Sequence, residues 1–340
     1  MALDDDRLLG ESPAFLRILE EVSQVAPLEK PVLLVGERGT GKELIAARLH
    51  FLSNRWEGQF LKMNCAAISD SLLESELFGH EAGAFTGATR THHGRFERAH
   101  GGSLFLDELA TTSVLVQEKL LRIIEYGEFE RVGGNKTLTC DVRLIAATNE
   151  DLPRLAARGK FRHDLLDRLA FDVLTLPPLR ERGSDILLLA NHFAVNMAKE
   201  LEREYFPGFT PAAKTALCEY PWPGNVRELK NVIERCVYRS EPEFEVDAIV
   251  FDPFDSPFRP TDAATAEAPR ASANPAANAS FPLDLKQTVQ ELEIDLINQA
   301  LEQAKHNQRK AAELLNLTYH QFRGYLRKYQ LLKSSNENDA

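Results

Sequence analysis

A glycine-rich segment between an apolar run and a helical pattern constrains the fold of this chain more than any other feature. The run PVLLV is followed by GERGTGK (36–42) and then by ELIAARLH, which has helical periodicity. Glycines let a loop turn its backbone N–H groups toward phosphate oxygens at a helix N-terminus, and a lysine can reach the outer phosphates. The spacing of Gly36, Gly41 and Lys42 therefore predicts a nucleotide-binding Walker A loop.

The residue after the lysine departs from the usual motif. Glu43 stands where a serine or threonine normally ligates magnesium. A carboxylate can hold this ion directly or through water, so Glu43 remains a candidate ligand. We expect eight loop residues to bind the nucleotide: Gly36, Glu37, Arg38, Gly39, Thr40, Gly41, Lys42 and Glu43.

A second motif complements the loop. In GGSLFLDE (101–108) a mostly apolar strand pattern ends in Asp107 and Glu108. Asp107 is suited to hold Mg²⁺, and Glu108 to polarise the water that attacks a phosphate. Taken alone, the segment could be a glycine-rich turn and a strand that ends in ordinary surface acids. Together with the first motif it predicts a nucleotide site with a catalytic magnesium ion.

Strand and helix patterns alternate in the first half of the chain, which is typical of an α/β fold with a parallel sheet covered on both faces. Five apolar runs are predicted to be buried strands: 31–36, 59–64, 103–107, 142–148 and 171–176. Beyond them the periodicity is helical only. The expected organisation is an α/β domain, a helical domain, a flexible linker and a C-terminal module, with the bounds 1–175, 176–250, 251–282 and 283–335.

The predicted linker has little to bury. Residues 253–282 contain six prolines and many Ala, Ser and Asn residues, a composition typical of disorder.

No secretory signal or membrane-spanning run is visible, and the cysteines form no metal-binding pattern, so we expect a reduced, cytoplasmic protein with buried thiols. The four cysteines are Cys65, Cys140, Cys218 and Cys236.

The C-terminal module is basic although the whole chain has a net charge of −11. NQRKAAELLNLTYHQFRGYLRKYQ (307–330) fits a helix–turn–helix, with Ala311 and Ala312 small where two helices cross and Thr318 as the N-cap of the second helix. A basic helix that binds a partner protein is the alternative. The residues expected to contact DNA are Thr318, Tyr319, His320, Gln321 and Arg323 at base edges or the helix start, and Arg327 and Lys328 at phosphates.

Six motifs together resemble those of the bacterial enhancer-binding proteins, AAA+ ATPases that activate RNA polymerase carrying sigma-54. The motifs are GERGTGKE, ELFGHEAGAFTGA, GGSLFLDE, FRHDLLDRL, LPPLRER and WPGNVREL. The resemblance covers nearly the whole chain except the linker, and a glutamate at position 43 is usual in the family. It implies ATP and Mg²⁺ as cofactors, enhancer DNA and sigma-54 polymerase as partners, a helical lid after the α/β part, and a Fis-like DNA-binding end.

Several residue roles follow from the resemblance alone. Asn64 is implied to pair with Glu108 and to link the nucleotide state to the loops, although an asparagine there could simply cap a strand end. Thr148 and Asn149 resemble sensor I, and Arg227 resembles sensor II. Arg162 and Arg168 resemble arginine fingers that a neighbouring subunit inserts into the site, which requires a ring, a hexamer in this family. On their own, these two arginines could instead pair with Asp164 and Asp167 on a helix surface.

The segment EAGAFTGATR (81–90) places an aromatic ring in a loop weakened by glycines. By itself the ring could tuck into the core. The resemblance instead implies that this loop grips sigma-54, and the expected contact residues are Gly83, Phe85, Thr86 and Gly87. A replication initiator, which opens an origin, would have no use for this loop. A nucleotide-gated repressor without turnover is the other alternative, and an intact Glu108 with two candidate fingers argues against it.

Regulation is expected to come from a separate negative regulator protein, because the motifs start near residue 8 and no receiver or sensory domain is visible before them. Trp56, in the polar turn NRWEGQF, is a candidate anchor for that regulator. The alternative is a tryptophan packed over the sheet edge.

Overall fold

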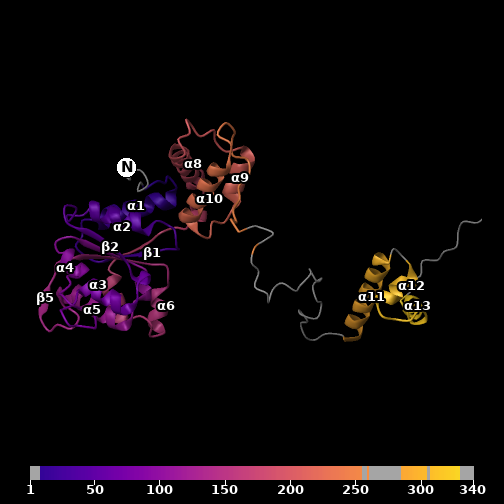
Figure 1. Ribbon diagram of the computed structural model, residues 1–340, viewed down its shortest axis with the longest axis horizontal. Coiled ribbons are helices and arrows are strands. Elements are labelled where there is room, and N and C mark those ends of the chain that lie inside the picture. Colours follow the sequence, from indigo (N-terminus) through magenta and orange to yellow (C-terminus); the bar gives the residue numbers. More distant parts are fainter. Residues whose placement is uncertain (1–7, 255–258, 260–284, 305–306, 330–340) are drawn as a thin grey trace, which may run out of the picture. The chain divides into compact units, whose positions relative to one another are not determined.

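The computed structural model describes residues 8–254, 259, 285–304 and 307–329. Most of the predicted linker and the acidic start of the chain lie outside these residues, so the prediction of a flexible linker is not addressed by the structure. The chain divides into two compact units, Met1–Pro253 and Phe254–Ala340. Each unit is described on its own (Figure 1).

A five-stranded parallel sheet organises the first unit (Figure 1). Its order is β2-β3-β6-β1-β7, with β1 at Val32–Val35, β2 at Phe60–Asn64, β3 at Ser103–Asp107, β6 at Arg143–Thr148 and β7 at Val173–Thr175. All five predicted strands are confirmed. Because the central strands β3, β6 and β1 are covered on both faces, they appear in the sequence as continuous apolar runs.

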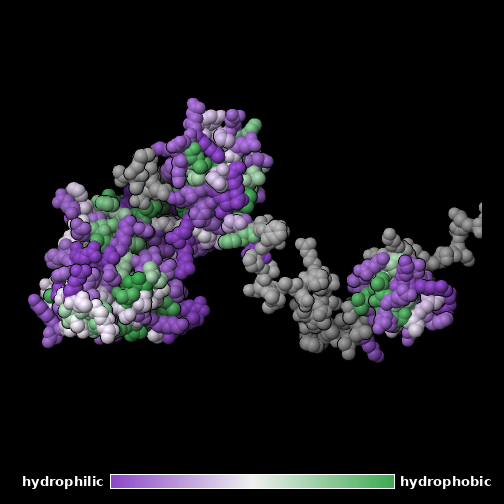
Figure 2. All heavy atoms as spheres, viewed as in Figure 1, coloured by the Kyte–Doolittle hydropathy of each residue, from purple (hydrophilic) through white to green (hydrophobic). Residues whose placement is uncertain are grey.

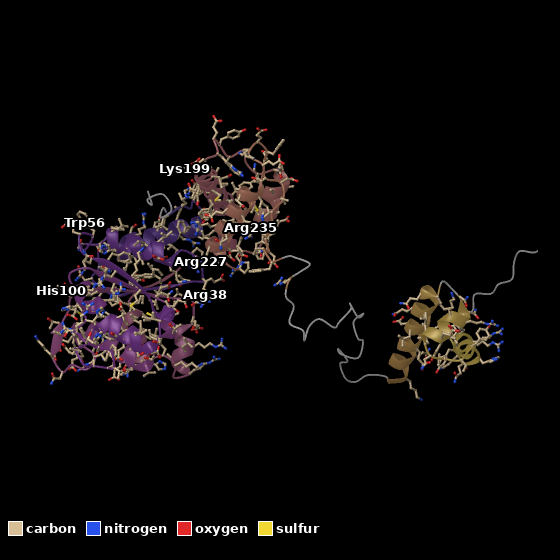
Figure 3. All side chains as sticks on the ribbon, in the orientation of Figure 1. Arg38, Trp56, His100, Lys199, Arg227 and Arg235 are labelled. Carbon is tan, nitrogen blue, oxygen red and sulfur yellow. The ribbon has the colours of Figure 1, made fainter. Side chains whose placement is uncertain are left out.

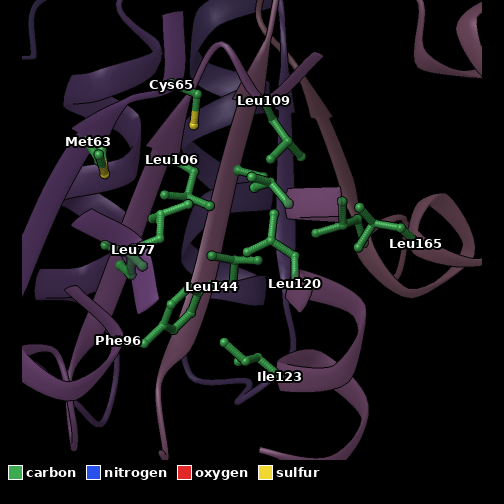
Figure 4. Close-up of a cluster of buried hydrophobic side chains, with 14 of the residues drawn as sticks. Met63, Cys65, Leu77, Phe96, Leu106, Leu109, Leu120, Ile123, Leu144 and Leu165 are labelled. Atoms are coloured by element: carbon green, nitrogen blue, oxygen red, sulfur yellow. The ribbon is translucent and has the colours of Figure 1, made fainter. Parts of the chain in front are cut away.

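Alternate side chains of these strands enter two separate cores. Phe105 on β3 faces α1 (Pro13–Val25) and α2 (Lys42–Phe51), while its neighbours Leu104 and Leu106 face the opposite side. The helices that cover this opposite side are α3 (Asp70–Phe78), α4 (Arg95–Arg98), α5 (Val114–Tyr126), α6 (Leu152–Ala157) and α7 (His163–Leu169). Figure 4 shows Leu106 and Leu144 of the sheet packed with Leu77, Phe96 and Leu120 of these helices.

A short antiparallel hairpin, β4 (Glu128–Glu130) with β5 (Thr137–Thr139), was not expected from the sequence. Its strands are only three residues long, so they carry too little alternation to be recognised. The hairpin lies beside the loop that follows α3, because Val132 accepts the N–H of Glu81 and donates its own N–H to Gly79. Two 3₁₀ turns, η1 (Cys65–Ala67) and η2 (Leu109–Thr111), follow β2 and β3 directly.

The helical part of the first unit has its own core. It begins with the 3₁₀ turn η3 (Leu179–Glu181) and contains α8 (Gly183–Glu200), α9 (Pro211–Glu219) and α10 (Asn225–Arg239). Trp222 is fully buried in this core, and its indole N–H donates to the carbonyl of Leu217 at 2.9 Å. The prediction of helical periodicity alone in this region is therefore confirmed.

The second unit contains three helices, α11 (Leu285–Gln303), α12 (Gln308–Leu314) and α13 (Tyr319–Lys328). Ala311 and Ala312 are buried in its core together with Phe322 and Leu326. Thr318 caps α13 by accepting the N–H of Gln321, as predicted. The helix–turn–helix is confirmed, with Asn316 in the left-handed region at φ 56° in its turn.

Three of the four thiols are buried as expected, but Cys218 is exposed. The prediction was wrong there because Cys218 lies on the outer face of the short helix α9, whereas Ala213 and Leu217 form its buried face. Burial raises the pKa of Cys65 and of Cys140 to about 12, so both thiols stay protonated and unreactive.

Among the residues that the structure describes, no helix combines the length and the apolar character that a bilayer span requires.

Candidate nucleotide site

The carboxyl ends of four parallel strands meet at one edge of the sheet and bring the predicted site residues together. Asn64, at the end of β2, is the register partner of Asp107 at the end of β3. Val35, which precedes the glycine-rich loop, is the partner of Thr148 at the end of β6. Ligand sites of open α/β sheets lie at this edge.

The glycine-rich loop has the backbone conformation that phosphate binding needs. Gly39 and Gly41 have φ of 78° and 95°, which a side chain would oppose. Among the described residues, the N–H groups of residues 39–43 have no protein acceptor, and they surround the N-terminus of α2. The loop therefore offers unpaired donors to an anion, which fits the triphosphate of a nucleotide.

Lys42 and the two acids at the carboxyl end of β3, Asp107 and Glu108, provide charges of the site. The Lys42 ammonium donates to the carbonyls of Gly36 and Glu37 at 2.9 and 3.0 Å. Partial burial lowers its pKa, whereas the negative charges of Asp107 and Glu108 oppose that shift. Burial raises the pKa of Asp107. A divalent cation would replace the water that this carboxylate has lost, so the donor set also fits Mg²⁺.

Glu108 is held in a strained conformation and paired within the loop. Its φ of 55° is unusual for a residue other than glycine, and its N–H donates to Oδ1 of Asp107 at 2.9 Å. Its carboxylate accepts from Arg38 at 3.2 Å. Backbone strain of this kind gathers at functional sites because the surrounding structure must impose it.

A pocket of about 440 Å³ opens between the loop and the helical part. Arg227, on the first turn of α10, and Asp107 both line it, and Figure 3 shows Arg227 near Arg38. One wall is apolar and is suited to the flat base of a nucleotide. The apolar residues of the pocket include Leu8, Leu9, Phe15, Leu189, Phe193 and Val226.

This apolar wall was not predicted from the sequence. Its residues come from the start of the chain, from α8 and from α10, and their pattern indicates only a helix core. A buried network joins these segments: Asp185 on α8 accepts the N–H groups of Glu11 and Ser12 at 2.6 and 2.9 Å. Arg182 donates to Asp185 and to the carbonyl of Leu9, at 2.8 and 3.0 Å. Because the hydrogen bonds between the start of the chain and α8 join residues more than 170 positions apart, no local sequence pattern predicts them.

The two acidic side chains among the eight expected nucleotide ligands, Glu37 and Glu43, are engaged by protein side chains. The carboxylate of Glu37 is bound by Arg180 and by the amide of Asn225. Glu43 pairs with Lys62 at 2.9 Å, and both side chains are about half exposed. Glu43 therefore has a ready alternative partner when it is not ligating a metal ion.

The residues implied to sense the nucleotide have other partners in this structure. The side chain of Asn64 accepts the N–H of Ala66 at 2.9 Å, so it caps the turn η1, as the simpler reading of an asparagine at a strand end proposed. Thr148 is fully buried and its hydroxyl accepts the N–H of Glu150 at 3.0 Å, whereas Asn149 is exposed.

The two candidate fingers are paired on the surface. Arg162 donates to both carboxylate oxygens of Asp164 at 3.0 and 2.7 Å, as the alternative reading anticipated. Arg168 pairs with Glu125 at 2.8 Å and not with Asp167, and it is 59% exposed. Surface pairs of this kind contribute little stability, so both arginines can exchange partners at low cost.

The GAFTGA loop carries its ring at the surface, as predicted. Phe85 is 44% exposed and meets the ring of His80 edge to face at 4.9 Å between centroids. Gly83 and Gly87 have φ of 85° and 106°, which explains the glycines at both positions. Thr86 is exposed beside the ring.

A charged network anchors the base of this loop. Arg131, next to the β4–β5 hairpin, donates to Glu81 at 2.7 Å and to both oxygens of Glu97 at 2.9 and 2.6 Å. Glu81 precedes the GAFTGA segment and Glu97 follows it on α4. The hairpin therefore holds both ends of the loop through one guanidinium group.

In the second unit, α13 presents the residues expected to contact DNA. His320, Arg323 and Arg327 are exposed, while Tyr319 lies under the guanidinium of Arg309 at 5.8 Å. Oε1 of Gln321 is engaged in the capping box with Thr318. Lys328 donates to Glu293 at 3.3 Å, so this lysine has a protein partner in the structure.

Three protein families match successive parts of the chain. They are the sigma-54 interaction domain (residues 8–175), the AAA+ ATPase lid domain (180–262) and the bacterial regulatory protein, Fis family (288–329).

Curated relatives match over most of the chain. The Psp operon transcriptional activator of Escherichia coli K12 is 58% identical over 332 residues, which are 97% of this chain and all of that protein. Regulatory protein AtoC of the same organism is 42% identical over 92% of this chain, which spans 65% of its length.

Solved structures of NtrX from Brucella abortus have the same fold. One superimposes with a TM-score of 0.67 at 29% identity and covers 95% of this chain and 69% of that chain. A complex of NtrX with ATP superimposes with a TM-score of 0.65 at 30% identity, covering 95% and 69% of the two chains.

Proposed function

The chain belongs to the family of sigma-54-dependent transcription activators of the AAA+ class, and from this membership we propose that it binds DNA upstream of a promoter and remodels the closed complex of sigma-54 RNA polymerase by ATP hydrolysis. One observation carries the proposal. The exposed Phe85 lies in a loop between β2 and β3, and these strands end at Asn64 and Asp107 beside the phosphate-binding loop. A change at the phosphates can thus reach the aromatic ring through two adjacent strands.

The chain is an ATPase, and its own residues account for the chemistry. Lys42 and the free loop N–H groups bind the phosphates, and Glu108 orients the attacking water. Asp107, with Glu43 as a second carboxylate, would hold Mg²⁺, which supplies charge neutralisation on the phosphate oxygens. In the proposed cycle Glu108 leaves Arg38 and pairs with Asn64, which passes the nucleotide state toward the loops.

The arginines support a ring of subunits. We assign Arg162 and Arg168 as fingers that act on a neighbouring subunit, because their surface partners Asp164 and Glu125 can be exchanged. Arg227 acts within its own subunit, since it lines the pocket beside Gly39 and Lys42. We assign Thr148 and Asn149 to the γ-phosphate sensor at the end of β6. A closed ring, with a hexamer as the family's form, would place each finger at one site.

The C-terminal helix–turn–helix binds DNA, and α13 is the proposed reading helix. Its exposed residues His320 and Arg323 suit base edges, and Arg327 suits a phosphate. The relative that is 58% identical over its whole length is named for the Psp operon, so we propose the phage shock operon as the regulatory target. Dimers formed through α11 would give two reading heads for a palindromic site.

A separate regulator is proposed to dock at Trp56. The side chain is 58% exposed, and Figure 3 places it well apart from Arg38 and Arg227. Hydrophobic residues also reach the surface of the first unit in Figure 2, and Phe51, at 63% exposure, is near Trp56 in sequence. An exposed aromatic side chain without a role in catalysis suits a protein partner that works in the cytoplasm with the activator.

Transcription in vitro tests the proposal. A sigma-54 promoter with an upstream enhancer should form open complexes when the chain and ATP are added, and should form none with a non-hydrolysable ATP analogue. Activation without hydrolysis, or activation with another sigma factor alone, would contradict it.

A further inference from the structure

The carboxylate of Glu37, in the phosphate-binding loop, is held by two residues of the helical part. Arg180 donates to both oxygens at 3.0 and 2.6 Å, and the amide of Asn225 donates to Oε2 at 3.0 Å. These hydrogen bonds, with those from Arg180 the largest cause, lower the pKa of Glu37 to about 2. Glu37 is therefore ionised at neutral pH and engaged with protein donors.

Burial and hydrogen bonds fix the position of Asn225 in this contact. It is fully buried, and its φ of 53° lies in the left-handed region that residues other than glycine rarely adopt. Its Nδ2 also donates to the carbonyl of Arg38 at 3.0 Å, and its Oδ1 accepts the N–H of Leu179 at 2.8 Å. One side chain thus joins the phosphate-binding loop, the turn η3 and the start of α10.

The loop backbone also contacts the start of α10 directly. Val226 donates its N–H to the carbonyl of Gly39 at 3.0 Å. A Cβ on Gly39 would collide with the carbonyl oxygen of Gly224, so a glycine is needed there for this close approach as well as for its φ of 78°. Gly224 and Val226, which make these contacts with Gly39, lie within three residues of Arg227, and Arg227 lines the pocket.

We infer that Glu37, Arg180 and Asn225 form a clasp that positions Arg227 beside the phosphates, so that Glu37 acts on ATP through the helical part and not by touching the nucleotide. Glu37 is then a positioning residue, whereas the sequence had suggested a direct ligand. The N-terminus of α10 is the rigid link, because Asn225 is its first residue and Arg227 lies on the same turn.

The clasp can be loosened without disturbing the core. The side chains of Glu37 and Arg180 are 42% and 45% exposed, in contrast to the buried Asn225. Glu37→Gln keeps the size of the side chain but removes its charge and replaces one of the two accepting oxygens with an amide donor. The partial exposure of the pair limits the expected effect to a rise in the KM for ATP of about 3- to 10-fold, with a smaller change in kcat.

A double-mutant cycle in the full chain tests the inference, which rests on the role proposed above for Arg227. ATP turnover is measured for the wild type, Glu37→Gln, Arg227→Ala and the double variant. If Glu37 acts through Arg227, Glu37→Gln should raise the KM in the wild-type background and have no further effect once Arg227 is alanine. Arg180→Gln should behave in the same way. Glu29→Gln, which removes one of the two acidic partners of Arg55, is the matched control and should leave turnover unchanged.

The contrary outcomes separate the inference from the function itself. An equal rise in KM in both backgrounds would show that Glu37 contacts the nucleotide directly and would overturn the clasp, while leaving Arg227 and the ATPase assignment intact. A KM that Glu37→Gln does not change would overturn it as well. If Arg227→Ala itself left turnover unchanged, the proposed role of Arg227 would fail, and the clasp with it.

Discussion

The guanidinium of Arg38 lies 3.2 Å from the carboxylate of Glu108, so the phosphate-binding loop holds the proposed catalytic glutamate in this structure. The carboxylate of Glu108 has no other partner among the hydrogen bonds of the described residues, and the left-handed backbone of Glu108 fixes the direction of its side chain. Phosphate groups that enter the loop would compete for Arg38 and free Glu108. Arg38 is therefore the partner that Glu108 has before phosphate groups enter the loop.

Glu108→Gln should abolish most ATP turnover and keep ATP binding. An amide cannot take a proton from the attacking water, and loss of such a group typically lowers kcat by about 100- to 10,000-fold. Steady-state hydrolysis and equilibrium binding of a fluorescent ATP analogue are the two measurements. Turnover within a factor of two of the wild type would contradict the assignment of Glu108.

The pH dependence of stability should report on Glu97. Burial alone would raise the pKa of Glu97, but hydrogen bonds, those from Arg131 first, lower it to about 2 from an ordinary value of 4.5. A carboxyl whose pKa is depressed in the folded state stabilises the fold above the unfolded pKa, and this contribution is lost as the pH falls from about 4.5 toward 2. Glu97→Gln should therefore lower the free energy of unfolding by about 1–3 kcal/mol at pH 7.

Urea unfolding at pH 7 and pH 3.5 measures this contribution. The difference in the free energy of unfolding between the wild type and Glu97→Gln should be smaller at the lower pH. For the surface variant Glu29→Gln, the difference from the wild type should be small at both pH values. A difference in the free energy of unfolding that is the same at both pH values would show that the contact with Arg131 does not lower the pKa of Glu97.

Local motifs made much of the site predictable. The loop around Lys42 and the strand before Asp107 keep their chemistry within a few residues, and the parallel topology then brings their ends together. The exposed ring of Phe85 was predictable for the same reason, since Gly83 and Gly87 mark a loop on either side of it.

What the sequence did not predict depends on contacts between distant segments. Asp185 binds the start of the chain, and Asn225 binds the phosphate-binding loop, across more than 170 positions in each case. Tertiary packing brings such pairs together, and no sequence motif predicts the contact that Asp185 or Asn225 makes. Gln321 was expected to contact bases, but its carbonyl oxygen accepts from Thr318, because a capping box competes for the same side chain.

Gly133→Ala should separate ATP hydrolysis from transcription. Gly133 has φ of 74°, and a Cβ there would lie 2.6 Å from the Cβ of Ala84 in the GAFTGA loop. The loop must shift, so activated transcription should fall about 10-fold while ATP turnover changes by less than about 2-fold. Gly101→Ala is the matched control, because Gly101 has φ of 77° and nothing within 4 Å of the added atom. Equal losses of transcription in both variants would attribute the effect to backbone strain alone.

Trp56→Ala should raise uninduced transcription from the target promoter several-fold in the host cell, because the regulator would lose an aromatic anchor. The ATP turnover of the purified variant should stay unchanged. Tyr205→Ala provides the comparison, since Tyr205 is 57% exposed on the helical part. Uninduced transcription that matches the wild type would remove Trp56 from the regulator's binding surface.

The coupling of ATP hydrolysis to sigma-54 is the central claim, and Phe85→Ala tests it most directly. The variant is compared with the wild type and with Phe244→Ala, which removes an exposed ring from the helical part. ATP turnover and open-complex formation by sigma-54 polymerase are measured on the same preparations. Phe85→Ala should keep ATP turnover within about 3-fold of the wild type and lose open-complex formation, because it removes the proposed contact with sigma-54 and leaves the residues of the nucleotide site unchanged. Wild-type open-complex formation by Phe85→Ala would contradict the account.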